Sequence, residues 1–130
     1  MYLLDTNIVA FYFRGNKNVV DKIKKIGLQN CFISEISIAE LKYGAQKSND
    51  IKKHTNLIEN FVLDINIISI IDVLDCFAFE KVRLEKLGTK LDNFDLLIGA
   101  TAIENELILV TNNTKHLQRM SINNLEDWTI

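Results

Sequence analysis

An apolar segment that runs directly into an acidic residue, Tyr2-Leu3-Leu4-Asp5-Thr6-Asn7, stands near the start of the sequence. Its apolar part predicts a short buried strand, and the pattern over 7–13 predicts a helix after it. Cys31-Phe32-Ile33 predicts a second strand, and Ser34 is a good N-cap for a helix from about 35 to 47. We therefore expect this part of the chain to alternate between strands and helices.

The same alternation continues along the rest of the sequence. We expect further helices at 17–28, 51–63, 74–87 and 94–105, further strands at 67–70 and 107–110, and Trp128 in a short final strand or tail. Such alternation predicts an α/β domain with a central, mostly parallel sheet of four to five short strands flanked by helices. Because the sequence has no Pro and no Gly- or Ser-rich linker, we expect a single domain over 1–130.

The composition excludes several classes of protein. A chain of 130 residues, 48% hydrophobic and 25% charged, suits one globular core. Its net charge of −2 argues against non-specific coating of nucleic acid but does not exclude a nuclease, and we expect basic pairs such as Lys52-Lys53 to be solvated. No apolar run is long enough for a membrane span and no signal-peptide pattern is present, so we expect a cytoplasmic protein. Cys31 and Cys76 lack the spacing of a zinc or disulfide site, and we expect reduced core cysteines.

Three acidic residues far apart in the sequence, Asp5, Glu40 and Asp95, each lie beside an apolar run. A carboxylate packed against a core is costly unless something compensates its charge, and a hard divalent cation is a natural compensator. Ligand sites in open α/β sheets form at the carboxyl ends of the strands, where these residues can meet. The sequence therefore predicts a metal site.

Two of these residues have simple structural alternatives. Asp5 could be no more than the N-cap of the helix that follows it. Glu40 could be a solvated helix residue, which is the usual place for Glu. However, Glu40 shares a helix face with Ser37 and Gly44, small residues that leave room for a metal or a phosphate group to approach.

Asp95 has an alternative of a different kind. Asp92 and Asp95 have the spacing of a capping box, and any carboxylate is favourable at a helix N-terminus. The helix is apolar on nearly all sides, and Asp95 shares a face with the small residues Gly99 and Ala102. We expect Asp92 to cap the helix and Asp95 to bind metal, although Asp92, one turn from Asp95, could also contribute to the metal site.

Other catalytic chemistries lack a matching pattern. His54 and His116 lie in polar contexts, with no Ser or Cys motif that would make a nucleophile and base pair. The glycines are scattered singly, so the sequence contains neither a phosphate-binding loop nor a dinucleotide fingerprint. Metal-assisted hydrolysis is the leading chemistry.

Four motifs follow one another along the chain. They are Tyr2-Leu3-Leu4-Asp5-Thr6-Asn7; Ile33-Ser34-Glu35-Ile36-Ser37-Ile38-Ala39-Glu40-Leu41-Lys42-Tyr43-Gly44; Gly88-Thr89 with Asp95-Leu96-Leu97-Ile98-Gly99-Ala100-Thr101-Ala102; and Leu109-Val110-Thr111-Asn112-Asn113 with Glu126-Asp127-Trp128. In this order, and over nearly the whole chain, they resemble the PIN-domain ribonuclease toxins of the VapC type.

The resemblance implies a PIN-like domain in which Asp5, Glu40 and Asp95 bind Mg²⁺ or Mn²⁺. It implies that Thr6 and Ser37 are supporting hydroxyls in the same pocket. Many members carry a fourth acidic residue where this chain has Asn113. An amide is a weaker ligand than a carboxylate, so binding of a second metal ion is in doubt.

The resemblance also implies an activity and partners. The activity is cleavage of RNA, often tRNA, with initiator tRNA cut in the anticodon stem-loop as one known choice. The partners are a cognate VapB-type antitoxin and a second copy of the toxin in a homodimer. The rival hypotheses are a non-catalytic PIN-like module that binds RNA or protein, and a structure-specific DNA nuclease.

Overall fold

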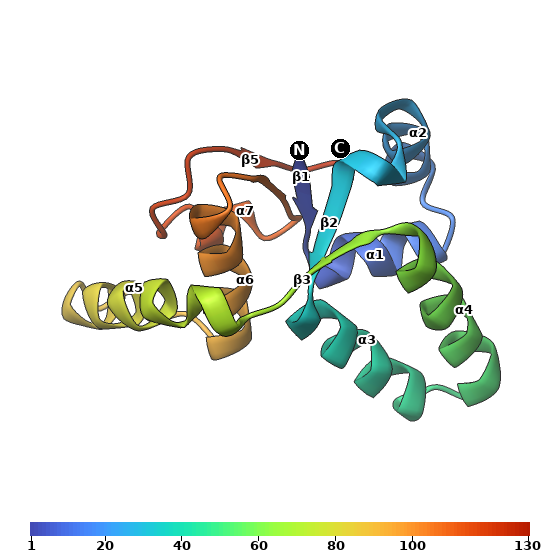
Figure 1. The fold of residues 1–130 in the computed structure, drawn as a ribbon, viewed down its shortest axis with the longest axis horizontal. Helices are drawn as coiled ribbons and strands as arrows, with labels where there is room; N and C mark the ends of the chain where they lie inside the picture. Colours follow the sequence, from blue (N-terminus) through green and yellow to red (C-terminus); the bar gives the residue numbers. More distant parts are fainter.

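A computed structural model describes all residues, 1–130, and shows a five-stranded parallel sheet with helices on both faces (Figure 1). The strands are β1 (Tyr2–Leu4), β2 (Cys31–Ser34), β3 (Asn66–Ile68), β4 (Ile108–Val110) and β5 (Leu125–Glu126). The α-helices are α1 (Thr6–Phe13), α2 (Lys17–Ile26), α3 (Glu35–Lys47), α4 (Ile51–Asp64), α5 (Leu74–Lys86), α6 (Asn93–Glu104) and α7 (Thr114–Leu117), with short 3₁₀ turns η1 (Leu28–Asn30) and η2 (Ile71–Val73). The prediction of an α/β domain with a mostly parallel sheet is confirmed.

The first strand lies at the centre of the sheet. The strand order is β3-β2-β1-β4-β5, so the chain first builds outward on one side of β1 and then on the other. Leu4 pairs with Val110, and the Asp5 N–H donates to the Val110 carbonyl at 2.9 Å. The carboxyl ends of β1 and β4 are therefore neighbours at the point where the strand order reverses, which is the usual position of a ligand site in such sheets.

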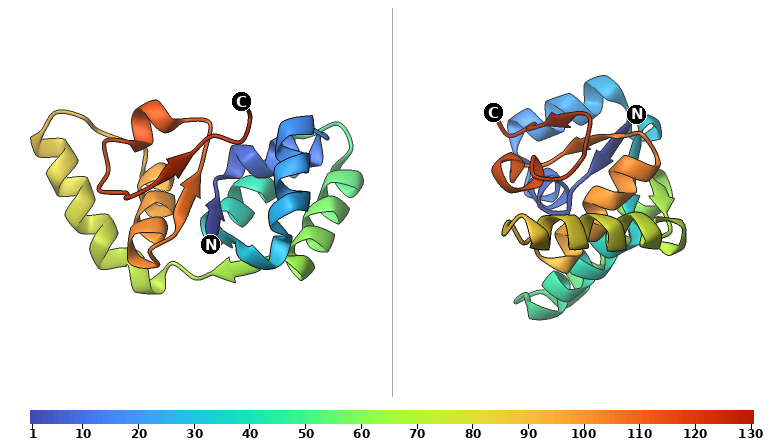
Figure 2. Two further views of the ribbon diagram at one scale, coloured as in Figure 1. Left: turned by 90° about the horizontal axis from the view of Figure 1, so that it is seen from above. Right: turned by 90° about the vertical axis from the view of Figure 1, so that its left-hand side faces the viewer.

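Successive residues of β1 point into two different cores, as the pleat of a strand requires. Leu4 belongs to a core formed with α1, α2 and α4, whereas Leu3 belongs to a core formed with α5, α6 and α7. Figure 1 shows these two groups of helices on opposite sides of the sheet, and Figure 2 shows α4 and α5 at opposite ends of the long axis. None of the helices has the length and apolar character that a membrane-spanning segment requires.

Several boundaries differ from those predicted. The helix expected over 17–28 ends at Ile26, because Gly27 takes a φ of +89° that a helix cannot continue through. The strand expected over 67–70 ends at Ile68. The prediction missed α7, a helix of four residues that is too short for an apolar period. Trp128 lies beyond β5, buried with its ring centroid 5.2 Å from that of Tyr2.

Gly99 has a packing role instead of making room beside Asp95. A Cβ atom at this position would collide with the Sδ of Met120, and the Ile122 side chain is also close. Both Gly99 and Ala102 are buried. The small face of α6 therefore lets this helix approach the segment after α7, and the space beside Gly99 is filled by Met120.

Candidate metal centre

Asp5 is held at the end of β1 by two hydrogen bonds. One carboxylate oxygen accepts from the Thr6 backbone N–H at 2.8 Å and so caps α1, and the other accepts from the Thr111 hydroxyl at 2.8 Å. The residue is 6% exposed, and burial raises its pKa although both hydrogen bonds act to lower it. Asp5 is thus the N-cap of α1, which was the structural alternative expected from the sequence. Each of its oxygens still has a lone pair left for a cation.

Thr6 connects Glu40 to Ser37. The Thr6 Oγ1 lies 2.6 Å from the Glu40 Oε1 and 3.0 Å from the Ser37 Oγ. Because a hydroxyl has one proton, the shorter contact makes Thr6 the donor to Glu40, and the Ser37 hydroxyl then donates to Thr6. Ser37 is fully buried, and its contact with the site runs through Thr6.

The solvated alternative for Glu40 does not match its surroundings. The side chain is half-buried on α3. Its pKa is raised, first by burial and then by the charges of Asp5 and Asp92, against the hydrogen bond from Thr6. The neighbouring face differs from the one expected, because Ser37 is fully buried whereas Gly44 is exposed, one turn along the helix.

Asp92 and Asp95 divide their roles at the start of α6. Asp92 caps the helix, since its Oδ2 accepts from the Phe94 N–H at 3.1 Å. Asp95, in the first turn, is half-buried and its carboxylate accepts no hydrogen bond within the protein. Its pKa is raised to about 6 by burial and by the nearby charges of Asp5, Asp92 and Glu40. The structure thus brings the predicted carboxylates into one electrostatic cluster.

No basic side chain balances this cluster. The ion pairs of the protein are Lys17–Asp21 and Arg83–Glu80, and neither involves the site. No three His, Cys, Asp or Glu side chains converge closely enough to enclose a bare ion. Mg²⁺ usually keeps several of its waters and is bound through one or two carboxylates. An oxygen-only, negatively charged set of donors therefore suits a hydrated Mg²⁺ or Mn²⁺ ion.

Asn113 reaches the site through its backbone. Its N–H donates to the Thr111 hydroxyl oxygen at 3.0 Å, and Thr111 in turn donates to Asp5. The side-chain oxygen of Asn113 is 2.5 Å from the Nδ1 of His116. This contact occupies one of the two lone pairs of the amide oxygen and orients it toward His116. A role for Asn113 as a ligand stays a prediction.

Thr111 is the residue that sequence reasoning missed. It carries no charge, and its importance follows from the pairing of Leu4 with Val110, which places the next residue of each strand side by side. A signal did exist, because Thr111 follows an apolar strand as Asp5 does. It could be recognised only once β1 and β4 were known to be neighbours.

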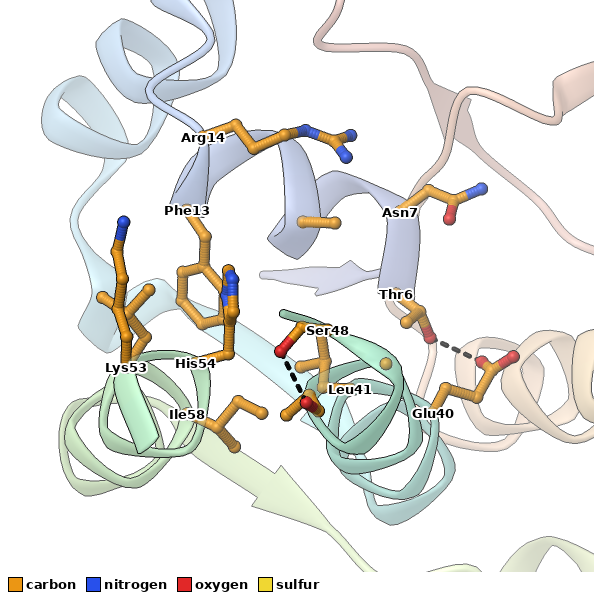
Figure 3. Close-up of a pocket in the computed structure, with 14 residues that line it drawn as sticks. Thr6, Asn7, Phe13, Arg14, Glu40, Leu41, Ser48, Lys53, His54 and Ile58 are labelled. Carbon is orange, nitrogen blue, oxygen red and sulfur yellow. Dashed lines mark hydrogen bonds between the residues drawn. The ribbon is translucent and has the colours of Figure 1, made fainter. Parts of the chain in front are cut away.

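A cavity of about 580 Å³ opens beside Glu40, between α1, α3 and α4 (Figure 3). Thr6, Asn7 and Glu40 line one end of it. The remaining walls are formed by Ala10, Phe13, Arg14, Leu41, Gly44, Ala45, Ser48, Lys53, His54, Leu57 and Ile58. The candidate centre is therefore open on the side of this cavity.

Comparisons with known proteins identify the family. Residues 2–123 match the family model of the PIN domain. The chain is 33% identical to the tRNA(fMet)-specific endonuclease VapC of Shigella flexneri, over 98% of each protein. The chain belongs to the VapC-type ribonuclease toxins of the PIN-domain family. It is also 31% identical to the ribonuclease VapC2 of Haemophilus influenzae, over 98% of this chain and 97% of the relative.

Solved structures of VapC-type proteins share the whole fold. A chain of the VapBC2 complex of Rickettsia felis, solved with a DNA fragment from the promoter, superposes with a TM-score of 0.89 at 29% identity over 98% of each chain. The predictions of the family, of the PIN fold and of a ribonuclease are confirmed. PIN-domain nucleases are typically metal-dependent, which agrees with the chemistry of the donors in this VapC-type site.

Proposed function

We propose that this VapC-type toxin is a Mg²⁺- or Mn²⁺-dependent endoribonuclease whose metal ligands are Asp5, Glu40 and Asp95. One observation carries the proposal. Carboxylates from three distant parts of the chain gather where the strand order reverses. Burial raises the pKa of all three, the charge of Asp5 adds to the rise at Glu40 and Asp95, and none of them forms an ion pair. A bound cation would remove the repulsion that the folded chain otherwise maintains.

The residues around the carboxylates hold them in place for catalysis. Thr111 and the Thr6 N–H fix the two oxygens of Asp5, and the Thr6 hydroxyl fixes Oε1 of Glu40. Asp95, without a hydrogen bond, is free to bind or release a ligand. When bound, the cation would activate a water for attack on the phosphodiester and neutralise the charge that develops on the phosphate. The protein itself then supplies placement and field.

A digestion of RNA and DNA tests this proposal. The purified protein is incubated with Mg²⁺ or Mn²⁺ and a single-stranded RNA, a tRNA or a DNA hairpin. We expect cleavage of RNA alone, and loss of that cleavage in Asp5→Asn and Asp95→Asn. Asp92→Asn is a matched control in the same turn as Asp95, because Asn caps a helix as well as Asp does. Full activity of folded Asp95→Asn would overturn the assignment, and cleavage of the DNA would favour a DNA nuclease.

We propose tRNA as the substrate class, with the anticodon stem-loop of initiator tRNA as the specific target. The support for initiator tRNA is the name of the Shigella relative, a tRNA(fMet)-specific endonuclease, at 33% identity. The anticodon stem-loop is proposed from the family resemblance alone. Sequencing of RNA 5′ ends after induced expression tests it. One dominant new end in the initiator tRNA is the expected result, whereas new ends scattered over messenger or ribosomal RNA would exclude this target.

We propose a VapB-type antitoxin and a second copy of this chain as partners. The support for the antitoxin is that the similar solved structures, from Rickettsia felis and Salmonella typhimurium, are VapBC complexes. The support for the second copy is the family resemblance together with exposed apolar side chains on α5, Phe79 and Val82 among them. Light scattering after gel filtration should give twice the 14.9 kDa chain mass, and a mass of one chain would contradict the dimer.

A further inference from the structure

The cavity beside the metal centre has two ends of opposite charge. Glu40 and Thr6 stand at one end, whereas Lys53 and His54 of α4 lie across the cavity from them (Figure 3). Arg14, at the end of α1, extends along the rim. Three basic side chains from two helices thus face a space that begins at the proposed cleavage centre.

The two long basic side chains of the cavity are not neutralised by the protein. Both Arg14 and Lys53 are exposed, and neither takes part in an ion pair. The Arg14 guanidinium lies 4.9 Å from the centroid of the Phe11 ring, a cation–π contact that orients the group and leaves its charge available. In a chain of net charge −2, this is an unused positive region beside an acidic centre.

The space between the two ends fits one nucleotide unit. A volume of about 580 Å³ lies within the range of small-molecule sites, which is roughly 300–1,000 Å³. Phe13 and Leu57 line it with apolar surface, on which a base or a ribose can rest. The cavity is open beside Gly44, where a Cβ atom added to the backbone would meet no other atom.

We propose that this cavity binds the RNA nucleotide next to the cleaved bond, with the two phosphates that follow the cleaved one held by Arg14 and Lys53 and assisted by His54. The inference rests on the proposed function, because it takes the cleaved phosphate to lie at the carboxylates. An RNA strand carries a phosphate at every nucleotide, so a strand whose cleaved phosphate is at Glu40 presents its next phosphates to the basic end. Arg14 and Lys53 are thus positioning residues, which place the strand without touching the reacting atoms.

The test measures RNA binding apart from cleavage. In an Asp95→Asn background with EDTA, the affinity for a labelled single-stranded RNA is measured by fluorescence anisotropy at several salt concentrations. Two double variants are compared. The cavity pair carries Arg14→Gln together with Lys53→Gln, and the control pair carries Lys24→Gln together with Lys52→Gln. The second pair removes the same charge from exposed positions outside the cavity. For single strands, each phosphate contact contributes about 0.7 to the slope of log K against log salt.

The cavity pair should reduce this slope by about 1.4 and lower the affinity at least about 10-fold at low salt, because two phosphate contacts are lost. The control pair should leave the slope unchanged. In the otherwise wild-type enzyme, the cavity pair should raise KM with little change in kcat. Equal losses of RNA affinity in the cavity pair and in the control pair would show that only the net charge matters, and this result would overturn the proposal. Unchanged RNA binding by the cavity pair would also overturn it and leave the cavity to a peptide partner.

The outcome is separable from that of the proposed function, since binding is read without metal. If the wild type cleaves RNA but the cavity pair of substitutions leaves RNA binding unchanged, only the nucleotide site is refuted. A wild-type protein that binds RNA through Arg14 and Lys53 but never cleaves it would refute only the proposed activity.

Discussion

Replacing Asp95 by Asn should stabilise the metal-free protein while it removes function. Burial and three neighbouring carboxylates raise the pKa of Asp95 from its ordinary value of 3.8 to about 6. At ~1.4 kcal/mol per pH unit, this difference corresponds to a penalty of about 3 kcal/mol for the charged form. Solvent screening at this half-buried site reduces the penalty to about 1–2 kcal/mol. Loss of the favourable interaction with the N-terminus of α6 costs about 0.5 kcal/mol, which leaves a net gain of about 1 kcal/mol.

The pH dependence of this gain has a defined sign. Because the folded protein holds Asp95 at a raised pKa, the penalty is fully present above about pH 6 and disappears below the unfolded value of 3.8. The free energy of unfolding is measured by urea denaturation with EDTA, at fixed protein concentration, from pH 4 to 8. The Asn variant should gain about 1 kcal/mol over the wild type at pH 7.5 and almost nothing near pH 4.

Asp50→Asn is the matched control for this measurement. Asp50 caps α4 through the Lys53 N–H, as an Asn would, and it lies outside the carboxylate cluster. The control should therefore be no more stable than the wild type at any pH. An Asp95→Asn variant that gains no stability at pH 7.5, or that gains as much at pH 4, would contradict the raised pKa of Asp95.

Three further predictions follow from the same contacts. Thr6→Val removes the donor to Glu40 and should lower metal affinity or RNA cleavage about 10- to 100-fold, whereas Thr6→Ser keeps the hydroxyl and most of the activity; equal rates in both variants would contradict this. Gly44→Ala should raise the free energy of unfolding by about 0.5–1 kcal/mol, since the added Cβ atom meets nothing. Gly99→Ala should lower the free energy of unfolding in the same denaturation assay, because its Cβ atom would collide with Met120. A more stable Gly99→Ala variant would contradict this packing. The apparent affinity for Mn²⁺, measured by calorimetry, should rise with pH through about 6, because Asp95 must lose its proton to bind the ion. An affinity that stays constant from pH 5 to 7 would contradict the role of Asp95 as a metal ligand.

Sequence patterns predicted most of the helices and strands, but not α7, and they pointed to the sheet edge where Asp5 lies. Ser34 was expected to cap a helix, and its hydroxyl accepts from the Ile36 N–H at 3.1 Å at the start of α3. Asp5 and Asp95 each stand where an apolar element meets a helix N-terminus, and a parallel sheet brings such points to one edge. These features depend on local spacing, which the sequence displays directly.

The contacts that depend on strand order and helix packing could not be predicted. Thr111 becomes a partner of Asp5 only because β4 lies beside β1. Gly99 and Gly44 look alike in the sequence, yet one is closed by a methionine side chain and the other faces an open cavity. Lys53 was expected to be a solvated residue of no special role, and its position across from Glu40 depends on how α4 packs against α3.

The most direct test of the metal centre is the rate of RNA cleavage as a function of Mn²⁺ concentration. For the wild type, the rate should be zero in EDTA, rise with the metal and saturate. For Asp95→Asn, it should remain at least about 100-fold lower even at saturating metal, with the fold intact by circular dichroism. Cleavage that persists in EDTA, or an Asp95→Asn variant that matches the wild type at every Mn²⁺ concentration, would contradict the assignment of the site.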